Sequence, residues 1–514
     1  MDKYSLPVCT EAFSASFEKP VSFEDILPEY CPGIRKILKA DAYVKAADTN
    51  FSGGVISVSA PCEIRVLYFA DNGALKSVSF SHNLDFAADS SKMTDNRGEP
   101  SFFAKICIPR VYAKNKSIRS IETKLDALVS ISACTSEVVK LFESDLSDDT
   151  ETKRTTSIMT ERIISESRDG EISDTITLDN SLPDASEIID YSVCISDFSS
   201  ECRNEMLVYT GNAVFKCTYK TVLTKEDGEN EYIYLKKTIP FEGNIAHEGI
   251  SENGRCVLDI TPCETDISLS ADPYGENRII GISVNYCTHA EIFCDKEVEF
   301  TYDGFCSSYE CEFENTEYCF DAFSDMISRS CNLSEIIPLN GISLTEITDT
   351  ELKLGSYSTE LHDGKVFVSA KAYAVIMGSD ANGEPCCIDH RFTIKECVDD
   401  TEHSSDRKYI ICCNASAQEA TLKDGELTLG YTLKADGVIL ERNTVKAISD
   451  ANVFYDKPKP VCRSEYIIYY PDKKETLWDI AKKYEIPQKK LAEANGIDES
   501  QTLNRKTVLI PCVL

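Results

Sequence analysis

Alternating apolar and polar positions recur in three similar passes through the first 455 residues. In each pass two alternating runs flank a turn that ends in glycine, and the three glycines, Gly73, Gly228 and Gly383, are 155 residues apart. A turn of the Asx-Gly type between two such runs favours a β-hairpin, because both central positions tolerate a positive φ. The pattern therefore predicts hairpin tips at Asp227-Gly228 and Asn382-Gly383, and an internal repeat of domain size.

Each repeat offers about seven short strands whose alternation is typical of half-buried antiparallel sheets. The predicted fold class is mainly β, with three tandem antiparallel β-sandwich-like domains followed by a small C-terminal βααβ domain. Downstream of the hairpins we expect one further strand pair per repeat, namely 104–108 with 125–131, 256–260 with 279–286, and 409–415 with 427–433. Acidic passages at 143–151 and 310–318 mark the boundaries between repeats. The predicted domains are 1–145, 155–308 and 318–455, then a Pro-rich linker at 456–464 and a domain at 465–514.

The last fifty residues change from alternating to helical periodicity. A β-type run at 465–470 precedes Thr476, a good N-cap because Asp479 lies three residues further on and completes a capping box. Apolar residues then recur at i, i+3, i+4 and i+7 from Leu477 to Tyr484, which predicts a short amphipathic helix. The sequence then predicts a second helix, which starts at Pro487, carries Leu491 and Ala494 on its inner face and ends at Asn495-Gly496. Val508 and Ile510 predict a closing strand.

This order of elements resembles the LysM domain, a module that binds N-acetylglucosamine (GlcNAc) glycans of peptidoglycan and chitin. The resemblance is carried by Glu475 to Ala481, Tyr484, Leu491, Asn495-Gly496 and the terminal Leu509-Ile510-Pro511. The chain departs from the family at Lys474-Glu475, where Gly-Asp is usual, and at Asn504-Arg505-Lys506, where Pro-Gly-Gln is usual.

The resemblance implies a groove that binds a glycan or a protein partner. Its loops contain Lys474, Glu475, Thr476, Leu477, Asn495, Gly496, Ile497, Asn504 and Arg505. Because both departures from the family fall in these loops, we expect the fold to be retained more firmly than the ligand. Trp478, the only tryptophan of the chain, is expected to be a core residue of this small domain.

Charge narrows the range of partners. The chain of 514 residues has a formal net charge of −33, and the segment 465–514 is balanced, so the whole excess lies upstream. A large acidic excess argues against nucleic acid and against anionic membrane surfaces, because both need clustered Lys and Arg. No signal peptide and no apolar run of membrane-spanning length is visible, so we expect a cytoplasmic protein without membrane insertion.

Candidate chemistry is sparse. The 23 cysteines are dispersed without a CxxC motif, which predicts reduced thiols rather than a disulfide framework, and neither Cys nor His falls at metal-ligand spacing. Among the six histidines, His390 lies three residues after Cys387 and forms the most tempting nucleophile–base pair, although incidental placement on neighbouring strand positions is the better interpretation. We therefore predict a protein that is not an enzyme, with no catalytic residues, no cofactor and no metal.

Three such repeats followed by one LysM-like module resemble clostridial spore-coat morphogenetic proteins of the SipL type. The upstream markers are Leu27-Pro28 and its echo Leu182-Pro183, the Asx-Gly hairpins, and the stretch Lys237-Thr-Ile-Pro-Phe241. The resemblance implies a structural adaptor in the mother-cell cytoplasm, which binds a coat-morphogenetic ATPase or other coat proteins and ends at the forespore surface. The alternative is a peptidoglycan-binding protein anchored to cortex or cell wall through the LysM module.

Overall fold

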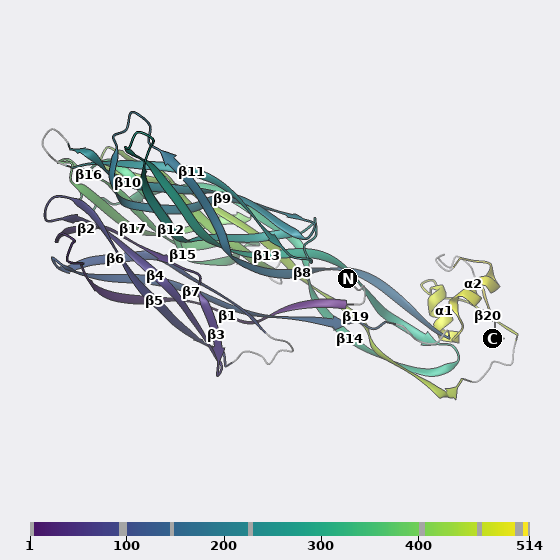
Figure 1. Ribbon diagram of the computed structural model, residues 1–514. Helices are drawn as coiled ribbons and strands as arrows, with labels where there is room; N and C mark the ends of the chain where they lie inside the picture. The colour runs from purple at the N-terminus through teal and green to yellow at the C-terminus, as the bar shows by residue number, and fades with distance from the viewer. Residues whose placement is uncertain are drawn as a thin grey trace.

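The computed structural model describes residues 5–91, 100–143, 149–224, 230–399, 407–459, 465–498 and 507–511. Within these residues, antiparallel strands form nearly all of the regular structure, and the two short helices both lie near the C-terminus (Figure 1). The predicted mainly β fold class is confirmed. Three units, each built from two facing sheets, form an elongated body, and a small module sits at one tip (Figure 1).

The first unit places its first and last strands side by side. β1 (Ser5–Ile26), β7 (Ser120–Lys140) and β6 (Ser101–Ser117) form one sheet in the order β1-β7-β6. In the facing sheet, β2 (Ile34–Val44) and β3 (Asp48–Ser52) pair with one edge of β4 (Val55–Ala70), and β5 (Leu75–Asp89) pairs with its other edge. Every second side chain of β4 and β7 is buried between the two sheets, so alternation in the sequence becomes one apolar face per strand.

The second and third units repeat this arrangement, each with six strands among the described residues. In the second unit, the sheet of β8 (Thr150–Thr177), β13 (Asn277–Cys306) and β12 (Arg255–Ala271) faces the sheet of β9 (Ala185–Arg203), β10 (Met206–Thr224) and β11 (Asn230–Ala246). In the third unit, the sheet of β14 (Tyr309–Ile337), β19 (Glu426–Pro458) and β18 (Lys408–Lys423) faces the sheet of β15 (Leu344–His362), β16 (Lys365–Asp380) and β17 (Pro385–Asp399).

The hairpins lie where the glycine turns predict them. Gly73 joins β4 to β5 with φ +80°, and Gly383 joins β16 to β17 with φ +78°, values that favour glycine at both positions. The tip predicted at Asp227-Gly228 lies outside the described residues. The pairing of 104–108 with 125–131 is confirmed. The other two expected pairs join the correct strands in a different register, since 256–260 pairs with 288–292 and 409–415 pairs with 433–439.

The strands are much longer than predicted, and this explains the register differences. β19 has 33 residues and β13 has 30. The acidic passage at 310–318 is not a linker but the beginning of β14, paired with the end of β19. Charged residues are compatible with a strand there, because a two-stranded ribbon exposes side chains to water.

First and last strands of each unit continue beyond the sandwiches as ribbons, and the ribbons of the second and third units carry the small module (Figure 1). A shared apolar cluster that includes Leu6, Met159, Val298, Phe300 and Phe320 holds the three ribbons together. At the tip, β20 (Tyr466–Tyr469), α1 (Leu477–Tyr484), α2 (Gln488–Asn495) and β21 (Val508–Pro511) form the small module, which we call the tail module. The predicted linker at 456–464 begins within β19, which ends at Pro458, and residues 460–464 lie outside the described residues.

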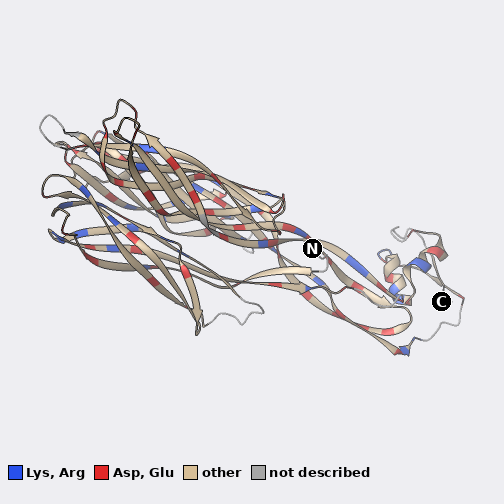
Figure 2. Ribbon diagram, in the orientation of Figure 1, with Lys and Arg blue, Asp and Glu red and all other residues tan. Residues whose placement is uncertain are grey.

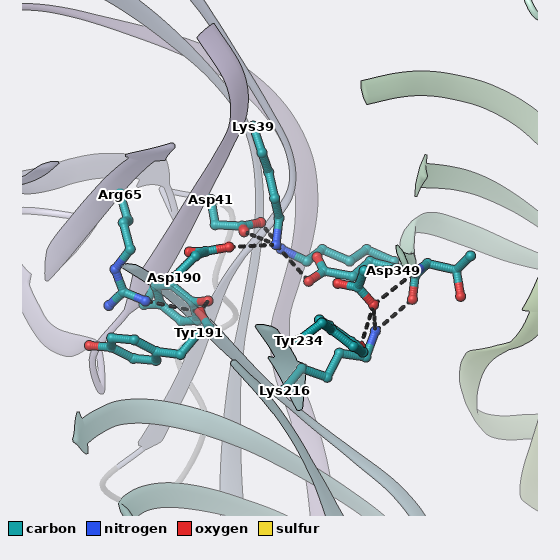
Figure 3. Close-up of polar contacts among 12 residues, drawn as sticks. Lys39, Asp41, Arg65, Asp190, Tyr191, Lys216, Tyr234 and Asp349 are labelled. Carbon is teal, nitrogen blue, oxygen red and sulfur yellow. Dashed lines mark hydrogen bonds and ion pairs between the residues drawn. The ribbon is translucent and has the colours of Figure 1, made fainter. Parts of the chain in front are cut away.

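The three units meet at a buried cluster of charged side chains (Figure 3). The Lys39 Nζ atom of β2 lies 2.7 Å from a Glu351 carboxylate oxygen of β15, 2.8 Å from Asp41 and 3.7 Å from Asp190 of β9. Nearby, the Nζ atom of Lys216 in β10 lies 2.7 Å from Asp349 of β15. Each unit therefore contributes charge to the same junction.

This junction orients the units more than it stabilises them. Burial alone would lower the pKa of Lys39, but Asp41, Glu351 and Asp190 raise that pKa well above its ordinary value, so the amine stays protonated. A buried ion pair contributes little compared with well-packed apolar residues, whereas one partner left alone is costly. A packing that separated the three units would break the pairs of Lys39 with Glu351 and of Lys216 with Asp349.

Candidate functional site

The tail module forms the elements that its sequence predicts. The Thr476 side chain accepts a hydrogen bond from the Asp479 backbone N–H at 3.3 Å, and the Thr476 backbone N–H donates to the Asp479 carboxylate at 2.8 Å. This is the predicted capping box. Gly496 ends α2 with φ +60°, in the left-handed region that favours glycine. β20 and β21 pair antiparallel, with Ile467 opposite Ile510.

The core of the tail module is small and apolar. It contains Leu477, Trp478, Ile480, Ala481, Leu491, Ala492, Val508 and Ile510. On α2 the buried alanine is Ala492, whereas the predicted Ala494 is only half-buried. The inner face of α2 is therefore formed by Leu491, Ala492 and Asn495.

Asn495 has a structural place in the module. Its amide nitrogen donates to the carbonyl oxygens of Leu491 at 2.8 Å and Leu509 at 2.6 Å, and its amide oxygen accepts from the Leu509 N–H at 2.8 Å. The side chain is buried and joins the end of α2 to β21. These bonds set the separation between the loop after α2 and the closing strand.

The other predicted groove residues fall into three groups. Lys474, Thr476 and Gly496 are exposed, Glu475 and Ile497 are half-buried, and Leu477 is in the core. The Glu475 carboxylate accepts hydrogen bonds from the Tyr469 hydroxyl, at 2.8 and 2.9 Å, and from the Asp472 N–H at 2.9 Å. The bond from Asp472, and then that from Tyr469, lower the pKa of Glu475. Asn504 and Arg505 lie outside the described residues.

Trp478 has a role that sequence reasoning missed. Its ring is 6% exposed and lies in a T-shaped contact with Phe305 of β13, with ring centroids 5.2 Å apart. Its indole Nε1–H donates to the Asp303 carboxylate of β13 at 2.8 Å. The expectation of a core residue is correct in part, because the same side chain also anchors the module to the body.

Further polar contacts complete this interface. Lys482 forms an ion pair with Asp303, and the Gln488 backbone N–H donates to both Glu151 carboxylate oxygens at 2.9 Å. Lys459 donates to Glu485 at 2.6 Å. Burial alone would raise the pKa of Asp303, but the contacts from Lys482 and Trp478 hold that pKa below its ordinary value.

A β-bulge presents Asp303 to the module. The register between β13 and β8 shifts between Thr301 and Asp303, and such a shift turns the following side chains. Trp478 and Lys482 lie four residues apart on one face of α1, and Glu485 is the C-cap that follows this helix. The loop before α1 and the loop after α2, where the predicted groove residues lie, are not among these contacts.

The candidate Cys387–His390 pair is not brought together. Residues three apart on β17 point to opposite faces of its sheet. The His390 ring stacks on Phe392, and its Nε2 atom lies 3.3 Å from Glu335. Burial raises the pKa of the Cys387 thiol to about 12. Neither residue is therefore arranged as nucleophile or base.

Charge and metal chemistry add little to the site. Acidic and basic residues both occur along the strands of the body (Figure 2). Among the described residues, no three His, Cys, Asp or Glu side chains are placed to hold a metal ion. In the same part of the chain, no helix has the length and apolar character needed to cross a membrane.

Comparison with known proteins identifies one segment. Residues 473–510 match the family described as LysM domain, which confirms that part of the predicted C-terminal domain. No curated protein and no solved structure matches the chain. The match covers both helices and the loops that carry the predicted groove residues.

Proposed function

We propose that this protein is a non-enzymatic binding protein that presents a LysM module at the end of a rigid β body, and that the module binds a GlcNAc-containing glycan. The observation that carries the proposal is the side on which the module docks. Trp478, Lys482 and Glu485 make the contacts with the body, and the loop before α1 and the loop after α2 supply none of these contacts. The LysM match over 473–510 supports a peptidoglycan or chitin glycan as the ligand class.

The described loops suit a neutral sugar. Lys474, before α1, and Gly496, after α2, are exposed. Ile497, which follows Gly496, is half-buried. The Glu475 carboxylate is engaged inside the module by Tyr469 and Asp472, so the loop before α1 is held in one conformation. A preorganised loop lowers the entropy cost of binding a ligand.

Calorimetric titration of the full chain with chitin oligomers and with muropeptides tests this proposal. Saturable binding is expected, and Lys474→Glu should weaken it several-fold. The matched control is Lys489→Glu, a lysine that is also exposed but lies in the first turn of α2, which should leave the affinity unchanged. Absence of binding at millimolar sugar would sink the glycan proposal.

A second candidate function is a protein adaptor of spore-coat assembly, with a coat-morphogenetic ATPase or another coat protein as partner in the mother-cell cytoplasm. The observation that favours it is the exposed Lys474, which stands where the family usually has glycine and so changes the surface of the loop before α1. Deletion of 465–514 should abolish capture of the purified ATPase. Unchanged capture would rule out a partner interface centred on the module, and expression outside sporulation would remove the coat role altogether.

A further inference from the structure

A cavity of about 380 Å³ lies where the first unit packs against the second. Strands β1, β6 and β7 line it from the first unit, β8, β12 and β13 line it from the second, and Tyr357 reaches it from the third. Two cysteines of the second unit, Cys263 of β12 and Cys287 of β13, are among the lining residues. Both thiols are partly exposed, in contrast to the fully buried Cys62 and Cys217.

Two neighbouring β-bulges lie beside these thiols. Cys263 is the extra residue of β12 between Pro262 and Glu264, where the register with β13 shifts. Cys287 pairs regularly with Thr261 of β12, and on its other side the register with β8 shifts between Tyr286 and Thr288, where β8 contributes the extra residue. The Cys263 thiol donates to the Cys287 sulfur, with the two Sγ atoms 2.8 Å apart. A bulge re-aims the side chain of its extra residue, and here the Cys263 thiol is turned to Cys287 on the cavity wall.

We propose that Cys263 and Cys287 form a dithiol–disulfide site that is oxidised by a low-molecular-weight disulfide entering this cavity. Proximity is the physical basis, because a second thiol held next to a mixed disulfide reacts far faster than one in solution. The cavity is the second basis, because it admits a small reagent to the pair. A disulfide here would join β12 to β13, two strands that already pair.

The reaction balances without any other reactant. The Cys287 thiolate attacks one sulfur of the small disulfide, which forms a mixed disulfide and releases one thiolate. Cys263 then loses its proton to solvent and attacks the Cys287 sulfur, and the second small thiolate leaves. The pair loses two electrons and two protons, and the reagent becomes two small thiols.

The surroundings favour ionisation of the attacking sulfur. Cys287 accepts the bond from Cys263, so Cys287 is the sulfur whose negative charge is stabilised. On the same wall, burial opposes protonation of His289, but Glu166 and Glu291 raise its pKa to about 9, so the imidazole is cationic at neutral pH. The hydrogen bond to Cys287, and then burial, raise the pKa of Cys263 well above its ordinary value, so Cys263 stays the protonated donor of the pair until Cys287 has reacted. Burial raises the pKa of Cys62 and of Cys217 to about 12, and neither of these thiols lines the cavity.

Incubation of the folded full chain with 2-hydroxyethyl disulfide, followed by peptide mapping of the cysteines, tests the proposal. We expect a link between Cys263 and Cys287, a loss of two hydrogens from the intact mass, and complete reversal by excess 2-mercaptoethanol. Cys263→Ser should stop the reaction at a mixed disulfide on Cys287. Circular dichroism of that variant shows whether its sheets are intact.

The matched control is Cys134→Ser, which breaks the other neighbouring pair, Cys9 and Cys134, and should leave the link between Cys263 and Cys287 unchanged. Two results would overturn the proposal. One is a map in which Cys263 and Cys287 remain reduced while other cysteines react. The other is an equal yield of mixed disulfide on Cys287 with and without Cys263.

Discussion

Replacing Asp303 by alanine should release the LysM module from the body. Asp303 accepts the Trp478 indole hydrogen bond and forms the ion pair with Lys482, so one substitution removes both contacts. The apolar contact between Trp478 and Phe305 remains. The contacts of Gln488 with Glu151 and of Lys459 with Glu485 also remain, so the variant tests only the two contacts that Asp303 makes.

The expected loss is about 2–3 kcal/mol. A hydrogen bond to a charged acceptor contributes about 1.5–3 kcal/mol. The ion pair adds about 0–1 kcal/mol, because the Lys482 side chain is 46% exposed and water screens the pair. The equilibrium between docked and released module should therefore shift by about 30- to 150-fold.

Tryptophan fluorescence measures this directly, because Trp478 is the only tryptophan of the chain. In the wild type its emission should be blue-shifted and poorly quenched by acrylamide, and in Asp303→Ala it should shift to the red and become quenchable. Glu299→Ala is the matched control, since that carboxylate lies on the same ribbon but pairs with Arg154. Identical spectra and quenching in wild type and Asp303→Ala would refute the assignment of Asp303 as anchor.

Three further predictions concern stability. Asp41→Asn should cost about 3–5 kcal/mol by urea denaturation, because Lys39 loses a buried partner. Burial alone would raise the pKa of Asp41, but Lys353 and Lys39 hold that pKa below its ordinary value. The stability from Asp41 is thus complete above the unfolded pKa of about 4 and is lost as the pH falls further, and the variant should lose this part of the acid dependence. Asn495→Ala should cost the module about 2–3 kcal/mol, since it leaves buried backbone groups unpaired; Trp478 fluorescence during denaturation reports it. For His289, the folded pKa of about 9 lies above the unfolded value of about 6.5, so its stability is complete below pH 6.5 and is lost as the pH rises toward 9. His289→Gln should flatten the stability profile over that range, and an unchanged slope would contradict the ion pairing with its two glutamates.

Local patterns predict local structure well in this chain. The capping box at Thr476, the helix end at Gly496 and the hairpin glycines Gly73 and Gly383 all depend on neighbours within a few residues. The registers of the long strands, by contrast, are not set by neighbours within a few residues. The pairing of 256–260 with 288–292 depends on two bulges and on the full length of β13, which no short window of sequence reveals.

The docking interface shows why the candidate site could be predicted only in part. The spacing of Trp478 and Lys482 is visible in the sequence and places both residues on one face of α1, with Glu485 at the C-cap of the helix. Their partners are not visible, because Asp303 and Lys459 lie on different units and Asp303 depends on a bulge. An amphipathic helix with an aromatic residue on its polar side is therefore a signal for a second interface, and here that interface decides which loops of the module stay available to a ligand.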